Sequence, residues 1–327
     1  MKLRFLQGNT SVSCGESYGF QKNTGIYALA QAMNELSALG VDPVDIALAK
    51  IRILTPANRE RARTWVLSKP MEKALQSFGA GVTPEVSGGI HSAVNQYYVH
   101  VTLAGTATGT AGEGDAAIAP GPGTENSIAE DGAAGNRAAL DETAAAPKPG
   151  DSIVMCGYAG LEGMLRIADE KTETLEARFA PTFIHQIKSL LPCIYQMEAA
   201  RMYLAGNPSY IYPCGEGGIF AALHYMAEEL KTGIEIDLRS VLLKQETVEV
   251  CELFRLNPYQ LMSTGCMLMV TEDPEGLLET FSKAEIPAAV IGFVREDHDK
   301  IIRNGEEMRY IDRPVPDELM KIFPSQR

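Results

Sequence analysis

The stretch Lys148-Pro149-Gly150-Asp151-Ser152-Ile153-Val154, which continues into Gly160-Leu161-Glu162-Gly163, decides the fold. Residues 151–157 are apolar enough to form a buried strand, and the glycines after them open a tight turn. A helical region follows from residue 165 to about 204. Proline cannot sit inside a helix, so we expect two helices with a break near Pro181 or Pro192. The stretch therefore predicts a strand, a glycine turn and helices in that order.

Strands and helices continue to alternate after this stretch. The hydrophobic patterns predict helices at residues 219–230, 245–254 and 277–283, and strands at 210–213, 234–238, 266–271 and 288–294. This order indicates an α+β domain with helices packed on one face of a sheet.

The segment before residue 148 breaks the globular pattern. More than half of residues 106–150 are Ala, Gly or Pro, and none is aromatic. Such a segment buries too little apolar surface to offset the entropy of ordering. We therefore predict a first domain at residues 1–105, a flexible linker or insertion at 106–147, and a second domain at 148–327.

The first domain also alternates between strands and helices. We expect helices at residues 25–39 and 58–78, with Trp65 and Leu75 on the core face of the second helix, and strands ending at 11–14 and spanning 45–54 and 97–103. This pattern indicates a sheet covered by helices.

Composition limits the partners of the chain. The formal net charge of -13 over 327 residues repels nucleic acid and anionic lipid, so we expect neither a nucleic acid nor a membrane as a partner. The six cysteines form no C-x-x-C pair and no zinc motif, and the N-terminus lacks a signal-peptide core. We interpret the cysteines as buried free thiols and expect a cytoplasmic protein.

Four glycine sites are candidate phosphate cradles, because glycine lets backbone N–H groups approach an anion. They are residues 157–163, 215–218, 263–265 and Ser87-Gly88-Gly89-Ile90-His91-Ser92. The alternative for each site is a tight turn without a ligand. None of them is a Walker A loop.

Taken together, these motifs resemble the AIR-synthase superfamily, and they are closest in pattern to its hydrogenase-maturation branch. Lys148 to Val154 resembles the opening strand of the second domain in that family. Glu216-Gly217-Gly218, Leu256-Asn257-Pro258-Tyr259 and Ser263-Thr264-Gly265 resemble later family motifs at consistent spacing, and Asp317-Glu318-Leu319 resembles the tail. The helix motif around Asn34-Glu35 and the turn Ser87 to His91 are looser matches in the first domain.

The resemblance implies a two-domain fold, ATP held between the domains and across a homodimer interface, Mg²⁺ on the ATP phosphates, and a small-molecule substrate. It implies Glu35 and Glu16 as metal ligands and the Gly88-Gly89 turn as phosphate cradle, with His91 as a donor. Asn34, Glu162 and Glu216 either orient the ligand or cap helices. The implied nucleotide-binding residues are Asn34, Gly88, Gly89, His91, Gly160, Glu162, Gly163, Glu216, Gly217 and Gly218.

Several positions depart from the family pattern. Cys14 and Pro213 stand where the family has Asp, and Glu35 replaces another Asp. Cys14 is either a buried small residue or a nucleophile with a lowered pKa. The chain ends without the C-terminal cysteine that receives the carbamoyl group in the maturation branch, so that reaction is not expected.

Two functions follow from these residues. The first is an ATP-dependent enzyme that activates an oxygen of a small substrate by phosphoryl transfer, which the retained Glu35, Gly88 and Gly89 favour. The second is a homologue that binds a nucleotide or a partner without turnover, which Cys14 and Pro213 favour.

Overall fold

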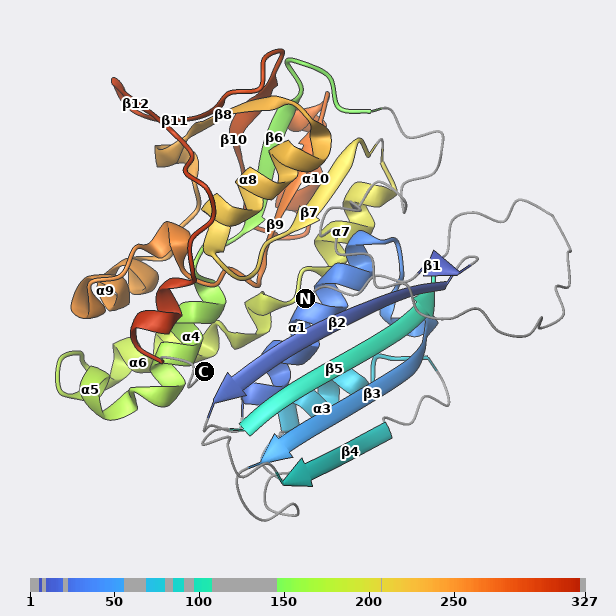
Figure 1. Cartoon of the computed structure of the whole chain (residues 1–327), viewed down its shortest axis with the longest axis vertical. Helices are drawn as coiled ribbons and strands as arrows, with labels where there is room; N and C mark the ends of the chain where they lie inside the picture. Colours follow the sequence, from blue (N-terminus) through green and yellow to red (C-terminus); the bar gives the residue numbers. More distant parts are fainter. Residues whose placement is uncertain are drawn as a thin grey trace, which may run out of the picture.

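The computed structural model describes residues 6–7, 10–19, 23–55, 69–79, 85–90, 97–107, 146–206 and 208–323. Figure 1 shows a smaller N-terminal sheet beside a larger C-terminal sheet, with helices between and around them. No helix among the described residues is both long and apolar enough to cross a membrane.

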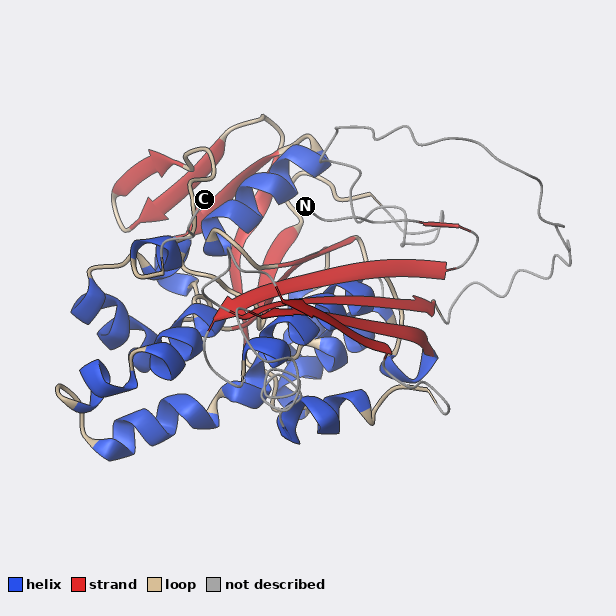
Figure 2. Cartoon of the chain, turned by 60° about the horizontal axis from the view of Figure 1, so that its bottom comes forward, coloured by secondary structure: helices blue, strands red, loops and turns tan. Residues whose placement is uncertain are grey.

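The N-terminal sheet has five strands in the order β1-β2-β5-β3-β4. Only β3 and β4 pair in parallel; the other neighbours are antiparallel. Helix α1 lies against one face of this sheet (Figure 2). The elements are β1 Leu6–Gln7, β2 Thr10–Gly19, α1 Thr24–Ala38, η1 Pro43–Asp45, β3 Ile46–Thr55, α3 Lys69–Leu75, β4 Glu85–Ile90 and β5 Tyr97–Thr106.

The two faces of the N-terminal sheet differ. Every second residue of β2 is buried against α1, and Ser13 donates its hydroxyl to the Ala32 carbonyl at 2.7 Å. Gly15 lets the helix approach closely, since an added Cβ would lie 1.9 Å from the Ala28 carbonyl oxygen. The intervening residues, among them Cys14 and Glu16, point to the opposite face. We call that opposite face the open face.

The C-terminal sheet has seven strands in the order β12-β11-β8-β10-β6-β9-β7. All neighbours are antiparallel except β8 and β11, and β10 contains a bulge between Val290 and Gly292. The strands are β6 Ser152–Gly157, β7 Tyr210–Pro213, β8 Gly233–Asp237, β9 Cys266–Thr271, β10 Ala288–Arg295, β11 Lys300–Asn304 and β12 Glu307–Tyr310.

Helices pack on both faces of the C-terminal sheet. Helix α8 covers one face through Ile219 and Leu223, while α7 and α10 cover part of the other through Tyr203 and Phe281. The helices are α4 Leu161–Glu170, α5 Thr172–Glu176, α6 Pro181–Ser189, α7 Met197–Leu204, α8 Gly218–Leu230, α9 Gln245–Phe254 and α10 Pro274–Lys283. Short 3₁₀ turns lie at η3 Leu191–Ile194, η4 Leu238–Ser240, η5 Pro258–Gln260 and η6 Glu318–Lys321.

The two domains share a core. One hydrophobic cluster runs from α1 and the N-terminal sheet through α4, α6 and α9 of the second domain. Asn34 on α1 adds polar contacts: its amide donates to the Ile194 carbonyl at 2.8 Å and accepts from the Gln196 N–H at 2.9 Å. Burial and hydrogen bonds together therefore fix α1 against the second domain.

The predicted α+β class and the two-domain architecture are confirmed. The predicted bounds of α9 and β9 are correct. The helical region after residue 160 holds four α-helices instead of the two predicted, since it breaks at Lys171 as well as near Pro181 and Pro192. Helices cover both faces of the C-terminal sheet instead of one. Of the helix predicted at 58–78, residues 69–75 are helical with Leu75 packed against the core, while Trp65 lies outside the described residues.

Other predictions are partly tested. The cysteines are all free thiols as predicted, but Cys14 and Cys193 are only half-buried. Most of the predicted linker lies outside the described residues, so the domain boundaries stay predictions.

Candidate functional site

The three glycine junctions of the second domain meet around residues 257–265. A Cβ added to Gly160 would lie 3.1 Å from the Pro258 carbonyl oxygen, and one added to Gly218 would lie 2.4 Å from that of Tyr259. A Cβ added to Gly157 would lie 1.9 Å from the Gly265 carbonyl oxygen. The predicted turns therefore form one packed unit at the domain junction, where α4 and α8 begin.

Most of the amides in this unit already have partners inside the chain. The N–H of Gly160 donates to the Ser263 hydroxyl at 2.8 Å, and that of Gly163 donates to the Met262 carbonyl at 2.9 Å. The N–H of Gly217 donates to the Asp317 carboxylate at 2.7 Å. In this structure the glycines allow the turns to pack closely, and their N–H groups bind atoms of the chain itself. Glu216 is the exposed residue of the unit, next to Gly215, around which a Cβ would meet open space.

Glu162 is a fully buried carboxylate at the domain boundary. It accepts hydrogen bonds from Gln31 of α1 at 3.1 Å to each oxygen, and Arg166 lies 3.6 Å away. Burial raises the pKa of Glu162, and Arg166 opposes that rise. Arg166 in turn donates to the Tyr18 carbonyl at 2.7 Å. Glu162 therefore ties the two domains together in this structure, as Asn34 does.

Asp317 belongs to the same unit and was not predicted as a site residue. Its side chain accepts the N–H groups of Gly217 and Leu319, at 2.7 and 2.9 Å, and is 3 % exposed as a residue. Burial raises its pKa to about 6, while the N–H donors and Arg166 oppose the rise. Asp317 belongs to the stretch that resembles the tail of the family, but no feature of the sequence predicts its hydrogen bond with Gly217.

The open face of the N-terminal sheet carries a second polar group. His100 Nδ1 lies 3.0 Å from Glu16 Oε1, and its Nε2 lies 3.0 Å from the Thr102 hydroxyl. Cys14 Sγ lies 3.6 Å from the same hydroxyl. Burial raises the pKa of the Cys14 thiol, and the carboxylates of Glu35 and Glu16 add to the rise. A raised pKa opposes the nucleophile interpretation of Cys14.

The two predicted metal ligands come from different layers of the first domain. Glu16 points to the open face, whereas Glu35 is 7 % exposed and lies on α1, which covers the other face. Nowhere in the described ranges do three or more His, Cys, Asp or Glu side chains form a group that could hold a metal ion.

The predicted phosphate turn of the first domain is placed differently. Gly88 and Gly89 lie inside strand β4 and pair with Ile53 and Leu54 of β3, so they do not form a turn. Strand β4 is at the edge of the sheet, separated from β2 by β3 and β5 (Figure 1). It therefore lies away from the glycine junctions of the second domain. His91 lies outside the described residues.

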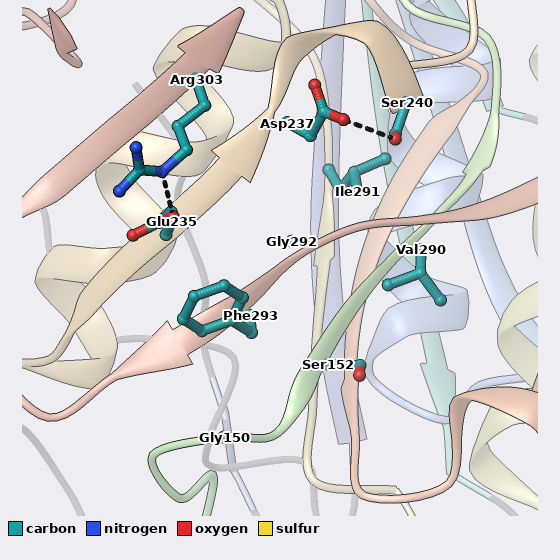
Figure 3. A pocket seen from close by; sticks show the side chains of 10 residues that line it. All are labelled: Gly150, Ser152, Glu235, Asp237, Ser240, Val290, Ile291, Gly292, Phe293 and Arg303. Atoms are coloured by element: carbon teal, nitrogen blue, oxygen red, sulfur yellow. Dashed lines mark hydrogen bonds and ion pairs between the residues drawn. The ribbon is translucent and has the colours of Figure 1, made fainter. Parts of the chain in front are cut away.

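A pocket of about 440 Å³ lies elsewhere, on the C-terminal sheet (Figure 3). Its polar side chains contact one another: Glu235 binds Arg303, and the Ser240 hydroxyl donates to Asp237 at 3.5 Å. Ser152, Glu235 and Phe293 point away from the face that α8 covers, so the pocket opens on the opposite face. No predicted site residue lines it.

Comparisons with known proteins give the relationships of the chain. Residues 148–304 match the family model "AIR synthase related protein, C-terminal domain". The carbamoyl dehydratase HypE of Rhizobium leguminosarum bv. viciae is 27 % identical over 172 residues, which cover 50 % of this chain and 46 % of that protein. The chain spans about half the length of the curated relatives it matches.

Solved structures show the same fold over nearly the whole chain. E. coli HypE superposes with a TM-score of 0.66 at 18 % identity, covering 95 % of this chain and 88 % of that one. A hydrogenase maturation protein HypE in complex with ATP superposes with a TM-score of 0.64 at 15 % identity, covering 97 % and 88 %.

Proposed function

Residues 148–304 form an AIR synthase related C-terminal domain, and from this premise we propose that the chain binds ATP at the junction of its two domains. The superfamily consists of ATP-dependent enzymes, and a structural neighbour of the same fold was solved with ATP. The observation that carries the proposal is the meeting of three glycine junctions where α4 and α8 begin, against α1 of the first domain. Helix N-termini of this kind favour phosphate.

Binding without turnover by a single chain is the function that the geometry supports best. In the sequence, Glu35, Gly88 and Gly89 favour the alternative function, phosphoryl transfer to a small substrate. Glu35 now lies on the covered side of the N-terminal sheet, and the two glycines lie within an edge strand. These positions weaken the case for an enzyme, and the changes at Cys14 and Pro213 favour binding without turnover.

The residues present do not fit Mg²⁺ within one chain. Carboxylate oxygens are the ligands that Mg²⁺ prefers, but they must all reach within about 2.1 Å of one point to give its near-octahedral geometry. Glu16 and Glu35 stand on opposite faces of the N-terminal sheet.

ATP-dependent turnover remains the second candidate, and the open face favours it. A sheet face that carries Leu48 at 40 % exposure beside a polar network is normally covered by another layer. We propose that a second copy of the chain covers it and forms a homodimer, which would bring further side chains to Glu16. The six free thiols support a cytoplasmic location for this assembly.

Thermal unfolding with ATP, with and without Mg²⁺, tests the proposal. ATP at 100 times its Kd stabilises the fold by about 2.7 kcal/mol, so a clear rise in Tm is expected. We expect this rise without Mg²⁺ and also in Glu35→Ala. A rise that requires Mg²⁺ and disappears in Glu35→Ala, together with ATP hydrolysis, would establish the enzyme instead. No rise under any condition would refute ATP binding.

A further inference from the structure

The C-terminal segment crosses the domain junction. Residues 315–323, which we call the strap, leave the C-terminal sheet and include η6. Leu319 is 1 % exposed and belongs to the core that the two domains share. The strap is therefore held by burial and not only by surface contacts.

Polar contacts join the strap to both domains. Glu318 accepts the Asn257 N–H at 3.1 Å, within the segment that the glycine junctions surround. Met320 Sδ accepts the Tyr18 hydroxyl of the first domain at 3.3 Å. Lys171 Nζ lies 5.5 Å from the centre of the Phe323 ring. One segment of nine residues thus contacts β2, the end of α4 and the loop before η5.

Asp317 is the polar centre of the strap. Its carboxylate accepts the N–H of Gly217, the residue before the first turn of the 13-residue helix α8. A carboxylate at this place is favoured by the helix dipole, as a phosphate would be. The charged groups around it are Arg166 and Glu162 of α4, Glu216 of the turn and the Tyr18 phenol of β2. Arg166 is the only cation among them.

We propose that the strap is an autoinhibitory latch, in which Asp317 occupies the Gly217 amide that an anionic ligand needs. This inference rests on the proposed binding of ATP at the junction. One N–H cannot serve both anions, and the negative charges of Asp317 and Glu216 repel a phosphate. A phosphate ligand must therefore displace Asp317. Because Met320 and Phe323 follow on the same segment, their contacts with Tyr18 and Lys171 loosen when Asp317 leaves.

Ligand affinity gives the first test. Titration calorimetry of the full chain with ATP and with inorganic pyrophosphate compares wild type with Asp317→Asn and Asp317→Ala. Losing the charge-assisted hydrogen bond to Gly217 removes the competitor, so both ligands should bind about tenfold more tightly or better. Asp312→Asn is the matched control: it removes the same charge from an exposed position five residues earlier, and its affinity should equal that of wild type.

Hydrogen exchange tests the latch without any ligand. In Asp317→Asn and Asp317→Ala, amides at 217–220 and 315–323 should exchange at least about tenfold faster than in wild type, while those of β6 keep their protection. Unchanged exchange at both segments would overturn the latch. If wild type binds ATP and neither variant binds it more tightly, the latch is wrong although nucleotide binding stands. If no variant binds either ligand, the proposed function is wrong, and hydrogen exchange alone decides whether the strap is held by Asp317.

Discussion

The side-chain amide of Gln31 donates to both carboxylate oxygens of Glu162, at 3.1 Å each, across the boundary between the domains. Arg166 is 4 % exposed and completes this buried group, 3.6 Å from Glu162. Glu162 was predicted to bind a nucleotide. Its observed partners make it a candidate for holding the domains in register, and stability measurements can separate the two roles.

Arg166→Met should lower the free energy of unfolding by about 3–5 kcal/mol, because it leaves the buried Glu162 charge without its cation. Adding Glu162→Gln to Arg166→Met should recover part of that loss. Urea titrations followed by circular dichroism measure both variants. Arg201→Met is the control, since the exposed Arg201–Glu198 pair is worth only about 0–1 kcal/mol. Equal losses at the two arginines would contradict the argument.

Asn34→Ala should cost about 1–3 kcal/mol of stability, because the Ile194 carbonyl and the Gln196 N–H lose their buried partner. The same substitution should leave the Kd for ATP within about twofold of wild type, measured by titration calorimetry at a temperature where the variant is folded. Asn304→Ala removes an exposed amide in β11 and should change neither quantity. Loss of ATP affinity without loss of stability would restore Asn34 as a ligand residue.

The pH dependence of stability should reveal Asp317. Burial raises its pKa from 3.8 to about 6, so the folded protein binds this proton more tightly than the unfolded chain does. The contribution of Asp317 to the free energy of unfolding is therefore present in full below about pH 4 and is lost as the pH rises through 6. Glu162, whose pKa burial also raises, acts in the same direction.

Urea unfolding between pH 4 and pH 7.5 measures this dependence. Asp317→Asn cannot ionise, so its stability should fall less steeply with pH than that of wild type. Asp312→Asn should keep the wild-type slope, because residue 312 is exposed. Superimposable curves for Asp317→Asn and wild type would show that the carboxyl group titrates normally in the folded protein.

The sequence predicted elements whose signals are local. The spacing of apolar residues between Gln245 and Phe254 predicts helix α9. Pro181 and Pro192 predict interruptions of the helical region, because proline cannot continue a helix, and each lies in the first turn of a new element. Strands β11 and β12 escaped prediction. Both are short: all four residues of β12 are exposed, and β11 buries only the adjacent Ile301 and Ile302, so neither shows the alternation of buried and exposed residues that marks a strand. Their pairing depends on neighbours far away in the chain.

The site was harder to predict because glycine signals a backbone shape and not the partner of its amide. Gly217 and Gly160 do sit at positive φ before helices, as the motifs indicate. Their N–H groups donate to Asp317 and Ser263, each about 100 residues away. Gly88 and Gly89 were predicted to form a turn of the same kind, but they lie in a strand. Parallel pairing with β3 overrides the preference of glycine for turns.

The open face supplies the last prediction, which concerns the homodimer. Strand register aligns Val12, Ala104 and Leu48 in one apolar row, and Glu16, His100 and Arg52 in a charged row four residues along. Self-association would bury the apolar row and let the mixed charges face each other. Leu48→Glu puts a carboxylate into that row and should weaken the dimer at least tenfold, which corresponds to about 1.4 kcal/mol.

Leu48→Glu should leave the fold intact, because Leu48 is 40 % exposed within the single chain and exposed substitutions usually change stability by about 0.5 kcal/mol or less. Sedimentation velocity over a range of concentrations should find a dimer for wild type and a monomer for the variant. Met308→Glu places the same charge on β12 of the other sheet and should remain dimeric. A wild-type monomer at all concentrations, or a Leu48→Glu dimer as tight as wild type, would leave the open face without this partner.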